Sequence, residues 1–176
     1  MNNEIKKYCE HCKFYSSLGC QSTLICKDGN KFLVFEALGV PVGKGRPKFS
    51  TVNGHAVAYT PAKTANYETL VRLSYQQQIG AFMFDKDKPL RAIIRAFFPI
   101  PKSVSKKKRE QMRDLRILHT KRPDVDNVIK AVLDALNGIA YYDDSQVAEV
   151  IISKAYAEQP KVMIELYEVD DIYAKR

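Results

Sequence analysis

The stretch Asn127-Val-Ile-Lys-Ala-Val-Leu-Asp-Ala-Leu-Asn137, followed by Gly138, decides the fold class of this chain. Its apolar residues recur every three or four positions, which predicts an amphipathic helix that ends at the glycine. Two strand-like stretches follow, at about 147–156 and 161–168, and a turn at Gln159-Pro160 joins them. Since strands and helices do not alternate as in a doubly wound fold, we expect an α+β fold.

The upstream sequence adds further elements to this fold. Strands are predicted at 32–38 and 90–98, and Asn53-Gly54 predicts a hairpin turn. Thr60-Pro61 predicts the start of a helix that ends near Gly80, with the threonine hydroxyl as its cap. The expected architecture is therefore a small mixed sheet packed with about three helices.

Length and charge limit the functions open to this chain. It has 176 residues, 28 Lys and Arg against 20 Asp and Glu, and a formal net charge of +8. It contains no apolar run long enough for a membrane span and no apolar stretch of a signal peptide at its start, so we expect a soluble cytoplasmic protein. A basic balance in such a protein favours a nucleic-acid or phosphate-rich partner, and solubility alone is the alternative.

Most of the excess charge lies in one stretch. Between Pro101 and Arg122, nine basic residues face two acidic ones, which gives a net charge of +7. Like charges in succession repel unless an anion lies alongside, although a solvated helix face capped by Ser105 is the alternative. The candidate DNA-binding residues belong to this stretch and to a basic loop at 39–48, and they are Lys44, Arg46, Lys48, Lys106, Lys107, Lys108, Arg109, Arg113 and Arg122.

All cysteines fall near the start of the chain, at Cys9, Cys12, Cys20 and Cys26. Disulfides are rare in a reducing compartment, so the choice is between a structural zinc site and free thiols. Cys9 and Cys12 have the spacing of half a zinc knuckle, while the second pair is spaced more loosely and His11 is an alternative ligand. We predict a Cys-rich extension at 1–30 and a main domain at 31–176.

Acidic residues that could take part in catalysis lie close together at 124–126 and at 143–144. If residues 124–126 are extended, Asp124 and Asp126 point to one side, and Lys130 lies one turn into the next helix. The turn at Asp143-Asp144 can bring a third carboxylate back to this pair. Clustered carboxylates repel unless a cation neutralises them, and hard oxygen ligands suit Mg²⁺ or Mn²⁺, which bind phosphate oxygens. The alternative is a helix cap beside an ordinary turn.

The same residues carry a family resemblance. Arg122-Pro-Asp-Val-Asp-Asn-Val-Ile-Lys130 and Tyr142-Asp-Asp-Ser-Gln-Val147 resemble the signature of RusA-type Holliday junction resolvases. Pro41-Val-Gly-Lys-Gly-Arg-Pro-Lys-Phe49 and the segment 59–68 resemble the amino-terminal half of that family. The similarity spans about residues 32–170. In some members a basic residue directly precedes the first aspartate, whereas Pro123 occupies that position here.

The resemblance implies a homodimeric α+β endonuclease that uses Mg²⁺, or Mn²⁺ in its place, to resolve four-way DNA junctions in recombination and repair. It places the metal ligands at Asp124, Asp126 and Asp144 and the catalytic lysine at Lys130. Asp143 and Asn127 are expected to support the site.

Symmetry gives a separate argument for a dimer, because two matched cuts related by a twofold axis need two identical sites. Two other functions stay open: a metal-dependent nuclease for other branched or duplex DNA, and a DNA-binding module without catalysis. A phosphatase of the haloacid-dehalogenase type is disfavoured, because residues 119–123 do not form the apolar strand that precedes its D-x-D motif.

Overall fold

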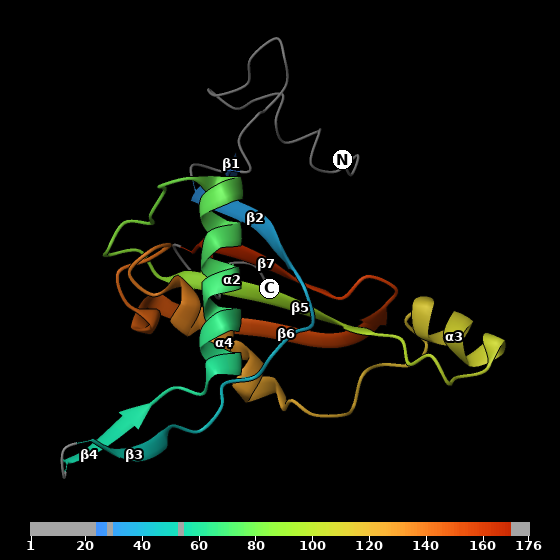
Figure 1. Ribbon diagram of the computed structural model, residues 1–176. Helices are drawn as coiled ribbons and strands as arrows, with labels where there is room; N and C mark the ends of the chain where they lie inside the picture. The colour runs from blue at the N-terminus through green and yellow to red at the C-terminus, as the bar shows by residue number, and fades with distance from the viewer. Residues whose placement is uncertain (1–23, 28–29, 53–54, 170–176) are drawn as a thin grey trace.

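The computed structural model describes residues 24–27, 30–52 and 55–169 and has the predicted α+β architecture (Figure 1). In chain order the elements are β1 (Leu24–Lys27), β2 (Asn30–Leu38), β3 (Lys48–Val52), β4 (His55–Tyr59), α2 (Ala62–Ile79), β5 (Leu90–Pro99), α3 (Lys106–Arg113), α4 (Val125–Leu136), the 3₁₀ turn η1 (Asp144–Gln146), β6 (Val147–Ala157) and β7 (Lys161–Glu168). None of the helices in the described part is long and apolar enough to cross a membrane.

The main sheet is mixed, with the strand order β1-β2-β7-β5-β6. Strand β5 runs parallel to β6 and antiparallel to β7. The two closing strands β6 and β7 are consecutive in the chain, yet they do not pair, because β5 lies between them. Strand β1 pairs with β2, so the sheet includes Leu24–Lys27 and Asn30 of the segment predicted as an extension.

The core lies between one face of this sheet and the helices α2 and α4, and Figure 1 shows α2 crossing in front of the strands. Side chains of β5 alternate strictly between buried and partly exposed, as expected when one face of a sheet is covered. Ala92, Ile94, Ala96 and Phe98 therefore point into the core. The other face carries ion pairs across neighbouring strands, including Lys161–Glu36 at 2.6 Å.

Helix α4 has the predicted amphipathic stripe, but the helix starts earlier than predicted. It begins at Val125, two residues before the predicted start, so residues 125–126 are helical and not extended. It ends at Leu136, and Gly138 follows with a φ of 70°, a left-handed conformation that glycine adopts easily. The stripe that packs into the core consists of Val128, Ala131, Val132, Leu133, Ala135 and Leu136.

Helix α2 ends at Ile79, next to Gly80 and as predicted, but its start differs. The residue that precedes its first turn is Pro61, and no side-chain hydrogen bond caps the helix, so Thr60 does not have the predicted role. Proline already has the backbone angle of a helix entry and offers no N–H that would need a partner.

Two sequence predictions, the zinc site and a hairpin turn, fall in part on residues that are not described. Cys9, Cys12 and Cys20 lie outside the described residues, as does the side chain of Cys26, so the zinc site stays a prediction. The turn at Asn53-Gly54 also lies outside, although the flanking strands β3 and β4 pair antiparallel with Val52 opposite His55.

His119 is a buried titratable side chain in the segment that leads to α4. Its ring stacks on Phe98 with centroids 3.9 Å apart and meets the edge of Tyr156 at 5.0 Å. Its Nδ1 atom is buried without a hydrogen-bond partner among the described residues. Burial, together with the nearby charges of Lys154 and Lys121, lowers the pKa of His119 below 6.5.

We therefore expect the protein to lose stability as the pH falls below about 6.5, because the unfolded chain then binds a proton that the folded chain excludes. The His119→Phe variant, which retains a stacking ring, should lose less stability than wild type between about pH 7.5 and 5.5. Urea unfolding at several pH values measures this, with His55→Gln at an exposed histidine as the control. Identical pH profiles for wild type and His119→Phe would contradict the expectation.

Candidate active site

The first turn of α4 presents two acidic side chains to solvent. Asp124 is the residue before the helix, with an extended backbone (φ −71°, ψ 156°), and its carboxylate makes no capping hydrogen bond. Asp126 lies in the first turn and is also exposed; Asn127 Nδ2 donates to one of its oxygens at 3.3 Å. Both carboxylates therefore keep lone pairs available for a cation.

The helical start changes the predicted geometry of this pair. Alternation along a strand does not apply, because only Asp124 has an extended backbone. Asp126 and Lys130, in contrast, are four residues apart in one helix and so lie on one face. The side chain of Lys130 is exposed, in keeping with its predicted place beside the acidic residues.

The segment that leads to Asp124 is attached to the sheet by a lysine. Lys154 of β6 donates from its Nζ atom to the backbone oxygens of Lys121 and Pro123, each at 2.7 Å. The Arg122–Pro123 peptide bond is cis. These contacts hold the residue before Asp124 against the edge strand, so the position of Asp124 is set by β6 as well as by α4.

The basic loop at 39–48 packs against the same helix start. The backbone N–H of Lys44 donates to Asn127 O at 2.7 Å. A Cβ atom on Gly43 would lie 2.7 Å from Pro123 Cβ and 3.0 Å from Asn127 Cβ, so only glycine fits there. On the other side of the loop, the N–H of Gly45 donates to Thr64 Oγ1 at 3.1 Å. The loop is thus held between the starts of α2 and α4.

A groove of about 700 Å³ opens between these segments. Its charged lining is mostly basic, with Asp124 as its acidic residue. The lining residues are Pro41, Val42, Gly43, Lys44, Gly45, Arg46, Pro61, Lys63, Thr64, Arg122, Pro123, Asp124 and Asn127. Three of its cations, Arg46, Lys63 and Arg122, have no ion pair within the described ranges. Such a groove suits a phosphate backbone that passes an acidic site.

Lys63 lines the groove, although the sequence did not predict it as a DNA-binding residue. It lies in the first turn of α2, and no regular spacing relates it to the cations of the basic loop. The signal that could have found it is the absence of Asp and Glu from Gly39 through Tyr67.

Lys44 has contacts that the sequence did not indicate. Its Nζ atom lies 2.6 Å from Glu68 Oε1 and 2.6 Å from Asp134 Oδ2, and all three side chains are largely buried. Burial by itself would lower the pKa of Lys44, but the hydrogen bonds to Asp134 and Glu68 outweigh it and raise the pKa. The lysine predicted to bind DNA therefore joins the loop to α2 and α4.

The second acidic segment forms a capped turn at the start of β6. Asp143 accepts a hydrogen bond from Ser145 N at 3.0 Å, and Gln146 accepts from Tyr142 N at 2.8 Å. The hydrogen bonds from Ser145 lower the pKa of Asp143. Its carboxylate is thus used for capping, while Asp144 is half-buried and makes no such bond.

The two acidic segments are not joined into one cluster. Across the described residues, no three His, Cys, Asp or Glu side chains lie close enough to hold a metal ion together. Asp144 instead lies near the buried hydroxyl of Tyr141, whose pKa is raised by burial and then by Asp144, Asp134 and Asp143. The ligand set Asp124, Asp126 and Asp144 therefore stays a prediction.

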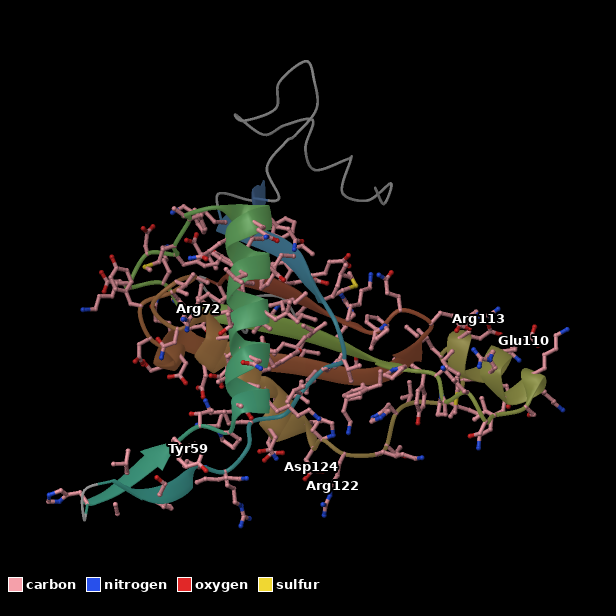
Figure 2. The ribbon with its side chains drawn as sticks, in the orientation of Figure 1. Tyr59, Arg72, Glu110, Arg113, Arg122 and Asp124 are labelled. Carbon is pink, nitrogen blue, oxygen red and sulfur yellow. The ribbon has the colours of Figure 1, made fainter. Side chains whose placement is uncertain are left out.

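The basic helix α3 lies apart from this groove, and in Figure 2 Arg122 and Asp124 fall between Tyr59 of β4 and Arg113 of α3. Ser105 accepts from Lys108 N at 3.4 Å and caps the helix, as the alternative of a solvated helix face had it. Arg109 and Arg113 both contact Glu158. Lys106, Lys107 and Lys108 are exposed and have no ion pair in the part of the chain described, which leaves them available to an anionic partner.

The Lys44→Met variant should be less stable than wild type by about 1–3 kcal/mol, because two largely buried carboxylates would lose their shared cation. Urea unfolding at neutral pH measures this. Lys63→Met is the matched control, since it removes a lysine of the same groove that has no ion pair among the described residues. Equal stability of the two variants would contradict the role assigned to Lys44.

Comparison with known proteins agrees with this geometry. Residues 39–167 match the family described as "Endodeoxyribonuclease RusA". The chain is 39% identical over 137 residues to the "Uncharacterized protein YqaN" of Bacillus subtilis (strain 168), covering 77% of this chain and 95% of that protein. It is 29% identical over 136 residues to the "Crossover junction endodeoxyribonuclease rusA" of Lactococcus phage r1t, with the same coverage.

The matched range begins at the basic loop and contains the groove, the start of α4, the capped turn at Asp143 and the basic helix. The chain therefore belongs to the RusA endodeoxyribonuclease family and is an enzyme that hydrolyses phosphodiester bonds in DNA.

Proposed function

We propose that this protein is a Mg²⁺-dependent resolvase, which cuts four-way DNA junctions by paired symmetric hydrolysis as a homodimer. The observation that carries the proposal is the placement of the exposed Asp124 carboxylate, unused by the helix cap, in a groove lined by Arg46, Lys63 and Arg122. The phage relative named as a crossover junction endodeoxyribonuclease supports the choice of substrate. Recombination and repair are the processes that such cutting would serve.

Phosphate recognition falls to the cations of the groove. Arg46 and Lys63 come from opposite ends of the hairpin segment and Arg122 from the segment before α4, so a DNA strand in the groove would meet basic groups from both walls. Such contacts fix the position of a backbone without reading its sequence. They would place one phosphate beside Asp124.

The acidic residues fit a hard divalent cation, because Mg²⁺ in proteins uses one or two carboxylates and keeps waters and substrate phosphates as its other ligands. Asp124 and Asp126 would hold it, with Asp144 as the proposed third ligand. The bound ion would acidify a water and neutralise charge on the phosphate, and Mn²⁺ could replace it. Lys130, on the same helix face as Asp126, would offset negative charge that develops on the oxygens. Asp143 would support the site by capping the turn that presents Asp144.

A homodimer follows from the substrate. Two cuts at symmetry-related positions need two sites related by a twofold axis, which an isologous dimer provides. Each protomer contributes one groove that contains Asp124, so we propose one site per protomer.

The Asp126→Asn variant should lose cutting of a labelled four-way junction by about 10³-fold or more, because a charged metal ligand becomes neutral. Its binding to the junction in EDTA should be equal to or tighter than that of wild type, since one repulsive charge is removed. Wild type should give paired nicks with Mg²⁺ and none with EDTA.

The control variant for this experiment is Asp87→Asn at an exposed aspartate outside the groove, which should cut like wild type. Equal cutting of a linear duplex of matching sequence would indicate a general nuclease. Tight binding without cutting, with Mn²⁺ also inactive, would indicate a binding module.

The double variant Lys107→Ala/Lys108→Ala should bind junction and duplex more weakly and reduce the slope of log K against log salt by about 1–2 units, if both lysines contact phosphates. Binding measured at several salt concentrations tests this. Lys86→Ala, at an exposed lysine before β5, is the control. An unchanged slope in the double variant would mean that α3 is only a solvated surface.

A further inference from the structure

The hairpin formed by β3 and β4 stands apart from the rest of the fold. The two strands form their own sheet, and Figure 1 shows them projecting away from the main sheet below α2. Every side chain described in β4 is exposed, and so are Lys48, Phe49 and Ser50 of β3. A two-stranded hairpin without a covered face is only marginally stable in water. Its aromatic side chains therefore need a partner.

The register of the hairpin shows which side chains share a face. Phe49 lies opposite Ala58, so its ring has only a methyl group across from it and remains 74% exposed. Lys48 lies opposite Tyr59, which is 47% exposed, and this pair projects from the other face. One face thus presents a free aromatic ring, and the other presents a cation beside an aromatic ring.

Charge identifies the class of partner. From Gly39 through Tyr67 the chain contains no Asp and no Glu, while Arg46, Lys48 and Lys63 are basic and have no ion pair within the described residues. A surface that docks on protein normally mixes both signs at its rim, whereas a surface without acidic residues complements phosphates. Exposed aromatic rings interleaved with cations are the combination that binds unstacked bases.

Both ends of the hairpin meet the groove described above. Arg46 lies two residues before β3, and Pro61 and Lys63 follow β4, and all three residues line the groove beside Asp124. In Figure 2, Tyr59 is at the base of the hairpin, and Asp124 and Arg122 lie beyond this base rather than beyond the free end of the hairpin. DNA that lies in the groove would therefore pass directly to the hairpin.

We propose that the hairpin is a recognition arm for branched DNA, in which Phe49 stacks on a base exposed at the branch point and Lys48 with Tyr59 contacts the adjoining backbone. This inference rests on the proposed function and names the residues that would distinguish a junction from a duplex. A linear duplex hides the faces of its bases in the stack, while a branch point interrupts the stack. A ring that needs an open base face would add affinity only at a branch.

The chain contains no tryptophan, so Phe49→Trp introduces a single tryptophan reporter in the arm, one residue pair from its base. In EDTA, a four-way junction should quench this tryptophan strongly, and a linear duplex of the same sequence should not. Phe49→Ala should weaken junction binding about tenfold and leave duplex binding within about twofold, since a base–aromatic stack is lost only at the branch.

Leu73→Ala, at a half-exposed leucine of α2, is the matched control and should bind both DNAs like wild type. Phe49→Ala should unfold at the same temperature as wild type because the ring is exposed. Equal quenching by junction and duplex, or no quenching by a junction that wild type prefers, would overturn the proposal. Iodide quenching of the tryptophan in the DNA-free protein gives a further test. If iodide quenches it less as the protein concentration rises, a second copy of the chain covers the hairpin, and the proposal is overturned.

Failure of the proposed function would give a different result from failure of the arm proposal alone. If wild type itself binds junction and duplex equally and cuts neither preferentially, the resolvase assignment fails, and the arm proposal fails with it. If wild type selects and cuts junctions while Phe49→Ala does so equally well, only the arm proposal fails.

Discussion

Burial of the apolar stripe of α4 between α2 and the sheet is the interaction on which the rest of this structure depends. Val128, Val132 and Leu136 are fully buried, and their packing fixes the orientation of the helix. The opposite face must then be turned to solvent, and it carries Asp126 and Lys130. The hydrophobic effect that forms the core thus also presents the proposed catalytic residues.

The same helix start organises the groove. Gly43 approaches Pro123 and Asn127 so closely that any side chain would collide with them, and Lys44 links the loop to Glu68 and Asp134. The loop is therefore part of the fold even though it has no regular structure. The hydrogen bonds from the backbone N–H groups of Lys44 and Gly45 fix the loop backbone just before Arg46, which reduces the backbone entropy lost when a phosphate binds there.

The protein separates two uses of charge. Lys44 and Lys154 have structural roles. Lys44 neutralises two carboxylates, and Lys154 holds the segment before Asp124. Arg46, Lys63, Arg122 and the lysines of α3 have no ion pair within the described residues and extend from the groove to the basic helix. A high net charge alone does not reveal this division, because each lysine or arginine adds one positive charge whichever role it has.

The sequence by itself determined the element types except for β1, the amphipathic stripe of α4 and the family motifs, because these depend on local spacing and chemistry. It could not determine that β5 would separate β6 from β7, since strand order depends on long-range pairing. Nor could it show that α4 begins at Val125 or that Lys44 is engaged with Glu68 and Asp134, 24 and 90 residues away in the chain. Those outcomes were decided by tertiary packing, which brings together residues that no local pattern connects.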